Sequence, residues 1–297
     1  GRNFNNKIWN AFRLIKGWTV DSTIEQPEAA ATAVKWFKMQ LDKTIAEMDD
    51  LFGKYRLSEA MMAVYKLFWD EFSSWYLEMV KPGYQQPVDK STYLSTLGFF
   101  DALLRLLHPF MPFITEELWQ HLCDRTDGES LMVSPLSMSA LVDEDIIREF
   151  EVVKEVISNI RSIRLQKNIA QKETLELQVI GENPVVAFNA VIMKMCNLSS
   201  INIVENKADG AASFMVGTTE YAVPLGNMID VEAEIARMEA ELKHKEGFLQ
   251  GVLKKLGNEK FVNNAPAAVL EMERKKQADA ESIIKSLKES IAALKKA

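Results

Sequence analysis

The heptad pattern in residues 228–297 restricts the fold of this part of the chain more strongly than any other feature of the sequence. Between residues 228 and 256 the apolar side chains recur at spacings that alternate between three and four, and a second seam runs from 270 to 294. Such a repeat predicts paired helices. Because Gly257-Asn258 falls between two seams of similar length, we expect the chain to fold back on itself as an antiparallel coiled-coil hairpin arm over residues 227–297.

The turn end of this arm is basic. Residues 243–276 hold eight Lys or Arg and four Asp or Glu. A charged coiled-coil surface is commonly only solvated, but a cationic end on a long arm also suits contact with nucleic-acid phosphates. The candidate contacts at this end are Lys254, Lys255, Arg274 and Lys275.

Residues 1–140 carry apolar residues at helical spacing, interrupted by glycine and proline. This pattern predicts a bundle of about five helices. Ser58 and Ser91 are the expected N-caps of the third and fourth, and the aromatic residues crowded into the third helix are expected to be core. The helices are predicted at 3–16, 28–52, 57–80, 91–107 and 113–123.

The periodicity changes in residues 141–226. A helix is expected at 143–168, after which Leu175, Leu177 and Val179 alternate with polar neighbours, as in a strand. The remaining pattern predicts a small α+β module, so that the whole chain is mainly α. Its further elements are a helix at 184–196 and strands at 201–204, 213–216 and 220–224, the last two forming a hairpin.

Charge is unevenly distributed along the chain. The 35 basic and 42 acidic residues give a net charge of −7, which excludes a protein coated uniformly with positive potential. Two stretches nevertheless contain no acidic residue and are candidate contacts for a polyanion. The first, before Asp21, holds Arg2, Lys7, Arg13 and Lys16, and the second, at 156–172, holds Arg161, Arg164, Lys167 and Lys172.

The sequence shows no sign of catalysis, metal binding or membrane insertion. No apolar run reaches eighteen residues and the basic N-terminus lacks a signal core, so we expect a cytoplasmic protein. Cys123 and Cys196 form no Cys-x-x-Cys pair, and the three histidines are scattered. Neither a nucleophile elbow nor a phosphate-cradling glycine loop is present. We therefore expect no catalytic residue, metal or cofactor in this chain, and binding as its function.

Two other functional classes were weighed against nucleic-acid binding. The coiled coil could belong to an interaction scaffold that pairs with another chain and binds no nucleic acid. Sedimentation separates these hypotheses, since a scaffold should be dimeric without RNA, whereas an intramolecular hairpin should be monomeric. An unrecognised enzyme is the third hypothesis, and the missing motifs argue against it.

The sequence resembles the C-terminal third of the bacterial valyl-tRNA synthetases, a family of class I aminoacyl-tRNA synthetases, over essentially its whole length. The stretch Leu107-His108-Pro109-Phe110-Met111-Pro112-Phe113 is shared with isoleucyl and leucyl relatives, whereas the arm that Ile229-Asp230-Val231-Glu232 begins is typical of the valyl family. The other matching stretches are Gly1-Arg2-Asn3-Phe4, Asn6-Lys7-Ile8-Trp9-Asn10, Tyr55-Arg56, Ser58-Glu59-Ala60, Phe68-Trp69, Glu71-Phe72, Trp75-Tyr76-Leu77-Glu78, Thr115-Glu116-Glu117-Leu118-Trp119, Ile160-Arg161, Ile163-Arg164 and Asn263 with Ala265-Pro266.

This resemblance implies an anticodon-binding helical bundle, a junction module and an arm that touches the outer corner of a valine-specific tRNA. The parent enzymes join valine to tRNA using ATP and Mg²⁺. Their catalytic and editing domains are absent from these residues, which should therefore be inactive alone and bind tRNA as a monomer.

The family also implies a site on the first helix. Its residues facing the anticodon loop match Lys7, Asn10 and Arg13, whose chemistry suits phosphates and base edges. The family usually carries Phe directly after the arginine, where a base could stack, and this chain has Leu14. Phe12 or another ring would then have to supply the stacking surface.

Overall fold

The structure is a computed structural model that describes residues 1–135, 140–226, 231–257 and 267–294. The chain divides into two compact units, residues 1–224 and 225–297. Each unit is described by itself.

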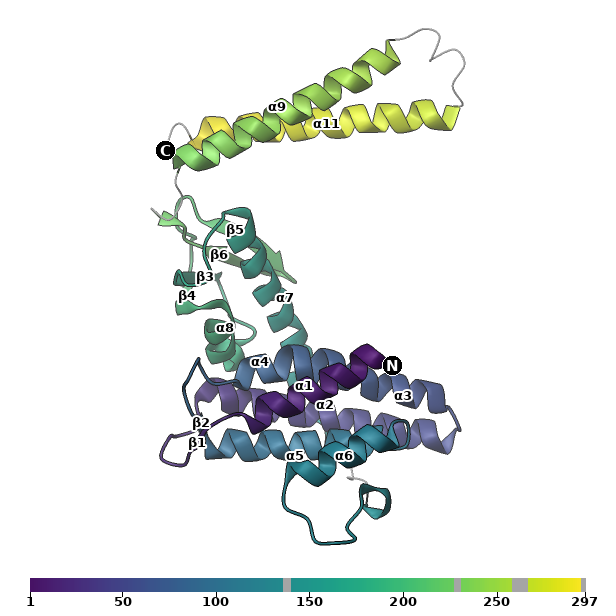
Figure 1. Cartoon of the computed structure of the whole chain (residues 1–297). Helices are drawn as coiled ribbons and strands as arrows, with labels where there is room; N and C mark the ends of the chain where they lie inside the picture. Colours follow the sequence, from purple (N-terminus) through teal and green to yellow (C-terminus); the bar gives the residue numbers. More distant parts are fainter. Residues whose placement is uncertain (136–139, 227–230, 258–266, 295–297) are drawn as a thin grey trace. The chain divides into compact units, whose positions relative to one another are not determined.

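The first half of unit one is a bundle of helices (Figure 1). The predicted helices are confirmed within one or two residues, except that the third consists of three consecutive segments. A short parallel pair, β1 (Val20–Asp21) with β2 (Val88–Asp89), was not predicted. The bundle contains α1 (Arg2–Lys16), α2 (Glu28–Gly53), α3 (Leu57–Lys66), the π-helix η1 (Leu67–Tyr76), α4 (Leu77–Val80), α5 (Lys90–Leu107), α6 (Pro112–Leu122) and, after it, the 3-10 turn η2 (Leu131–Val133).

The aromatic residues of the third helix form core, as predicted. Phe68, Phe72 and Tyr76 are fully buried, and Phe72 lies 5.2 Å from the ring of Phe37 on α2. The predicted caps are wrong. Ser58 lies inside α3, and the N-cap of α5 is Asp89, whose carboxylate accepts a hydrogen bond from the Thr92 amide at 2.8 Å.

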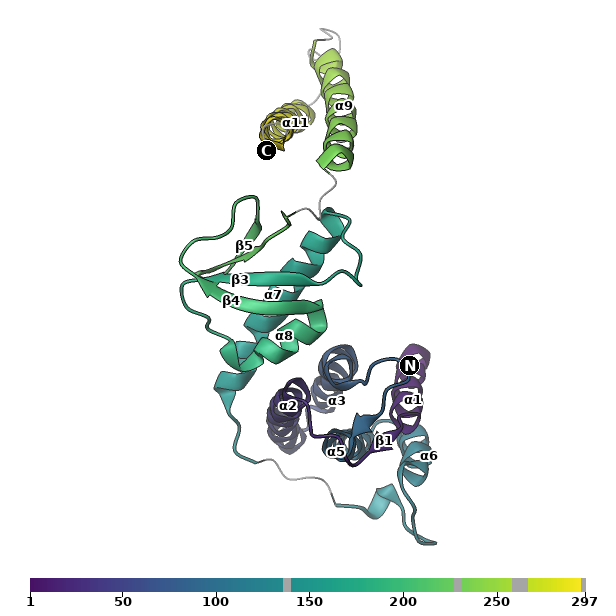
Figure 2. The same cartoon turned by 90° about the vertical axis from the view of Figure 1, so that its left-hand side faces the viewer.

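The second half of unit one is an α+β module. Its four-stranded sheet has the order β4-β3-β6-β5, with β3 and β4 parallel and the β5–β6 hairpin antiparallel. Leu175, Leu177 and Val179 all point to the buried face of β3, as their alternation predicts, and α7 runs along the sheet (Figure 2). The elements are α7 (Glu144–Gln166), β3 (Leu175–Ile180), the 3-10 turn η3 (Val186–Phe188), α8 (Asn189–Cys196), β4 (Leu198–Val204), β5 (Ala212–Val216) and β6 (Thr219–Val223).

Unit two is the predicted hairpin of long helices, α9 (Val231–Leu256) and α11 (Ala267–Leu294), which lie side by side (Figures 1 and 2). Val252 on α9 and Ala280 and Ile284 on α11 are buried at heptad positions. An ion pair between Glu246 and Lys288, 2.8 Å apart, also joins the two helices. The first seam position, 228, and the predicted connection at 258–266 lie outside the described residues.

One seam position holds a buried charge. Glu273 is 6% exposed, accepts a hydrogen bond from Lys276 at 2.8 Å and lies 3.9 Å from Lys255 on the other helix. Its pKa is held below the ordinary value, first by the Lys276 hydrogen bond and then by the charges of Lys255 and Lys276. In its ionised form, Glu273 therefore forms an ion pair with Lys255 that links α11 to α9.

Because the pKa of Glu273 is lowered on folding, its contribution to stability is present above the ordinary carboxyl value of 4.5 and lost as pH falls through the lowered value. Glu273→Gln should consequently increase amide exchange in α9 and α11 at pH 7, relative to the wild type. As the pH falls below 4.5 through the lowered pKa, this difference between the two proteins should shrink, after correction for intrinsic exchange rates. Glu281→Gln, at an exposed position of α11, is the control. An effect of Glu273→Gln that stayed the same as the pH fell would contradict this role.

Candidate nucleic-acid interface

A polar groove of about 430 Å³ lies between α1 and the consecutive segments η1 and α4. Helix α1 buries Phe4, Ile8, Ala11 and Ile15, so that the helical period turns its polar residues to this side. The groove concentrates amide, hydroxyl and ammonium groups, which are the groups that bind base edges and phosphates. It is lined by Asn3, Asn6, Lys7, Asn10, Ala11 and Leu14 from α1 and by Ser73, Leu77 and Glu78 from η1 and α4.

Lys7 is held in place by two residues of η1. Its ammonium lies 4.2 Å from the centre of the Trp69 ring and donates a hydrogen bond to the Ser74 hydroxyl at 3.4 Å. That hydroxyl donates in turn to the carbonyl oxygen of Trp69 at 2.8 Å. Burial lowers the pKa of Lys7, and the nearby Asp70 carboxylate partly offsets this effect. The ammonium is thus directed by an indole face and a hydroxyl.

Trp69, Ser73 and Ser74 all belong to η1, the π-helix at residues 67–76. A π-helix turns less per residue than an α-helix, and π-helical segments are frequent at functional sites. The π-helix could not be predicted from the sequence, because its apolar spacing also fits an α-helix. Ser73 was missed for this reason. Asn3 and Asn6, on α1, were missed although the crowding of asparagine in that helix was a visible signal.

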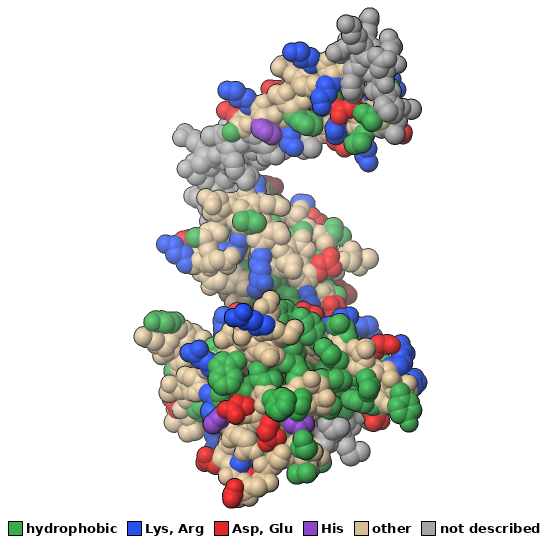
Figure 3. Space-filling model, turned by 45° about the vertical axis from the view of Figure 1, so that its right-hand side comes forward, with side chains coloured by type: hydrophobic (Ala, Val, Ile, Leu, Met, Phe, Trp, Pro, Cys, Tyr) green, Lys and Arg blue, Asp and Glu red, His purple; other side chains and the backbone are tan. Residues whose placement is uncertain are grey.

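The other predicted residues of α1 are exposed but separate into two groups. Asn10 lines the groove beside Lys7, whereas Arg2 and Arg13 lie outside it. Trp9, one helical turn before Arg13, is 40% exposed. Exposed apolar side chains gather over the bundle in Figure 3.

Leu14 lines the groove where the family usually carries phenylalanine. Phe12 is half-buried, with its ring 6.1 Å from that of Trp9 and 6.2 Å from that of Phe100. It does not line the groove. Trp9 is therefore the more exposed of these two rings on α1.

The second basic stretch contains one wrong prediction. Arg164 is 1% exposed, and its guanidinium donates hydrogen bonds to the carbonyl oxygens of Ala170, Cys196 and Asn197 at 3.0, 2.8 and 3.3 Å. Its charge stabilises the interior of the module and cannot contact RNA. Arg161, three residues earlier on α7, is exposed, and Lys167 is partly exposed.

The predicted contacts of the arm are all on the surface. Lys254, Arg274 and Lys275 are exposed, and Lys255 is exposed although it lies 3.9 Å from Glu273. Their position near the ends of α9 and α11 that face the turn agrees with the predicted basic end.

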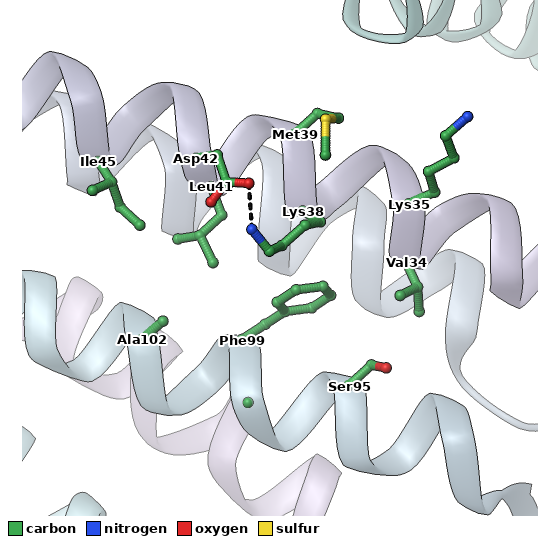
Figure 4. A pocket seen from close by; sticks show the side chains of 11 residues that line it. Val34, Lys35, Lys38, Met39, Leu41, Asp42, Ile45, Ser95, Phe99 and Ala102 are labelled. Carbon is green, nitrogen blue, oxygen red and sulfur yellow. Dashed lines mark hydrogen bonds and ion pairs between the residues drawn. The ribbon is translucent and has the colours of Figure 1, made fainter. Parts of the chain in front are cut away.

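Another cavity, of about 550 Å³, lies between α2 and α5 (Figure 4). Its walls are mainly apolar, with Leu41 and Phe99 among them, and its charged pair, Lys38 with Asp42, is joined in an ion pair. Nothing in it resembles a catalytic constellation.

The described residues contain no cluster of three or more His, Cys, Asp or Glu side chains arranged to hold a metal ion. Among them, no helix combines the length and the apolar character that crossing a bilayer requires.

Comparison with known protein families identifies two domains. The description "Anticodon-binding domain of tRNA ligase" matches residues 34–179, and "Valyl tRNA synthetase tRNA binding arm" matches residues 230–295. The chain therefore carries the anticodon-binding portion of an aminoacyl-tRNA synthetase. The first match begins after α1, so the residues of α1 are covered only by comparison with whole relatives.

Those relatives cover the full chain. It is 77% identical to the valine–tRNA ligase of Bacteroides thetaiotaomicron over 100% of its length, 48% identical to that of Christiangramia forsetii over 99%, and 34% identical to that of Enterococcus faecalis over 99%. This chain belongs to the valyl-tRNA synthetase family. It spans about a third of the length of these relatives, 34%, 34% and 35% respectively.

Proposed function

We propose that this chain binds valine-specific tRNA through two separate surfaces, with the groove beside α1 reading the anticodon loop and the basic end of the arm contacting the tRNA at its outer corner. The observation that carries the proposal is the directed ammonium of Lys7 among the amides of Asn3, Asn6 and Asn10 in one open groove. The matches to an anticodon-binding domain and a tRNA-binding arm support it.

Each group in the groove has a role that fits its chemistry. An asparagine amide both donates and accepts, so it can distinguish base edges that differ in these groups. The Lys7 ammonium adds a charge at a fixed place. Arg13 and Arg2, outside the groove, would bind phosphates of the same loop, and Trp9 offers a ring on which an unpaired base could stack.

The remaining functions of the family are proposed for parts outside these residues. Joining valine to tRNA with ATP and Mg²⁺, and editing, would be the work of catalytic and editing regions of the kind found in the longer relatives. The chain would act in the cytoplasm. It would be a monomer, because α9 and α11 pack against each other within one chain.

The test is a titration of tRNA carrying the valine anticodon and of the same tRNA with another anticodon. Lys7→Ala with Asn10→Ala should reduce the preference for the valine anticodon on the order of 10- to 100-fold, since each lost base contact costs roughly 1–3 kcal/mol. Lys7→Ala with Arg13→Ala should also reduce it, but with a larger loss of affinity for both tRNAs.

The matched control is Lys90→Ala with Asn202→Ala, two exposed residues outside the groove. It should leave the preference unchanged. Full anticodon preference in the Lys7 and Asn10 double variant would refute the assignment of the groove.

A further inference from the structure

A second basic surface lies beside the groove, where α4 meets α7 and α8. Glu78 lines the groove and also forms an ion pair with Lys81, 2.5 Å away, at the end of the same helix. The ammonium of Lys194 on α8 donates a hydrogen bond to the carbonyl oxygen of Lys81 at 3.0 Å. Two lysines from different elements are thus brought together one helical turn from the groove.

Arg161 on α7 completes this surface. Its guanidinium lies 5.8 Å from the centre of the Trp75 ring, and Trp75 packs edge-on against Phe150 with 5.7 Å between ring centres. Trp75 precedes Glu78 on the same helical segment, so Arg161 and Lys81 flank one stretch of η1 and α4. Lys81, Arg161 and Lys194 are all exposed.

The charges of this surface do not cancel. Burial lowers the pKa of Lys194, and the neighbouring charge of Lys81 lowers it further, while Glu78 acts in the opposite direction. Arg161 also lies close enough to Cys196, two residues beyond Lys194, to act on the pKa of its thiol. Lys81 and Lys194 therefore share one carboxylate, that of Glu78, while Arg161 lies beside the same helical segment at Trp75, and an anion on this surface would relieve the repulsion between the two lysines.

We propose that Lys81, Arg161 and Lys194 form a phosphate-binding surface that holds the tRNA backbone next to the nucleotides read in the groove. This inference rests on the proposed function. RNA phosphates fit this surface better than an acidic protein partner does, because the surface continues into a groove lined by amides. The three cations also come from separate elements, an arrangement that suits a curved backbone. It binds without regard to sequence, since phosphates are the same in every tRNA.

The test uses the complete chain with Lys81→Gln, Arg161→Gln and Lys194→Gln combined. Glutamine removes each charge but can still donate to the Lys81 carbonyl, which keeps the contact between α8 and α4. Affinity for both tRNAs should fall about tenfold or more, with the anticodon preference unchanged. The slope of log affinity against log salt should become shallower by about 2 to 3.

The matched control is Lys35→Gln, Lys66→Gln and Lys90→Gln, which changes the net charge equally at exposed positions away from this surface. Circular dichroism should show that both triple variants are folded. A loss no greater than that of the control, or a loss confined to one anticodon, would overturn the phosphate surface while leaving the proposed function intact. Failure of the wild-type chain to bind either tRNA would overturn both.

Discussion

Replacing Arg164 with methionine should lower the free energy of unfolding of residues 1–224 by about 3 kcal/mol or more. The substitution keeps an unbranched side chain of similar length but leaves the carbonyl oxygens of Ala170, Cys196 and Asn197 without their buried donor. Hydrogen bonds to a charged donor contribute about 1.5–3 kcal/mol each, and buried acceptors left without partners add a desolvation cost. Urea unfolding followed by circular dichroism measures the change.

Two comparisons make this prediction specific. Arg161→Met, three residues away on the same helix but exposed, should change stability by about 0.5 kcal/mol or less. Arg164→Lys keeps the charge but loses the planar fork, so its stability should lie between those of the wild type and Arg164→Met. If Arg164→Met unfolded at the same urea concentration as the wild type, these hydrogen bonds would not stabilise the module.

Removing residues 228–297 should weaken binding of every tRNA on the order of 10²- to 10⁴-fold, by nearly the same factor for each anticodon. Two surfaces on one chain that bind one ligand make the second contact intramolecular, and this advantage disappears when one surface is removed. The described residues of the arm offer exposed charges such as Lys254 and Arg274. Its contribution should therefore depend on salt and not on the anticodon.

The shortened chain should retain the thermal unfolding transition of residues 1–224, because the arm is a separate compact unit. A second variant keeps the arm but replaces Lys254, Lys255, Arg274 and Lys275 with glutamine. It should reproduce most of the loss in affinity. If deletion changed the preference between anticodons but not the overall affinity, the arm would be reading sequence and the proposed division between the two surfaces would be wrong.

Periodicity in the sequence predicted most of the secondary structure, because burial imposes it directly. The α9 and α11 seam and the alternation of Leu175, Leu177 and Val179 each reflect one buried face. The resemblance to the valyl family implied one site formed by Lys7, Asn10 and Arg13, and the structure places Lys7 and Asn10 in one groove and Arg13 outside it. The predicted roles of these residues in reading the anticodon remain predictions.

Charge was a less reliable guide than periodicity. Arg161 and Arg164 look equivalent in the sequence, yet one is exposed and the other is enclosed by three carbonyl groups. Those carbonyls belong to residues up to 33 positions away, so no local pattern could distinguish the two arginines. Ser91 was likewise a reasonable cap by residue type, but the helix begins one residue earlier, at Lys90, and Asp89 occupies the capping position.

The π-helix at residues 67–76 has a consequence for how this segment can change in length. Loss of a single residue within it would allow ordinary α-helical hydrogen bonding, but it would also turn the buried rings of Phe68, Phe72 and Tyr76 relative to one another. The same loss would rotate Ser74 and Trp69 relative to each other by roughly a quarter of a turn and withdraw the support of Lys7. A deletion here would thus disturb the packing of the bundle and the position of the Lys7 ammonium at the same time.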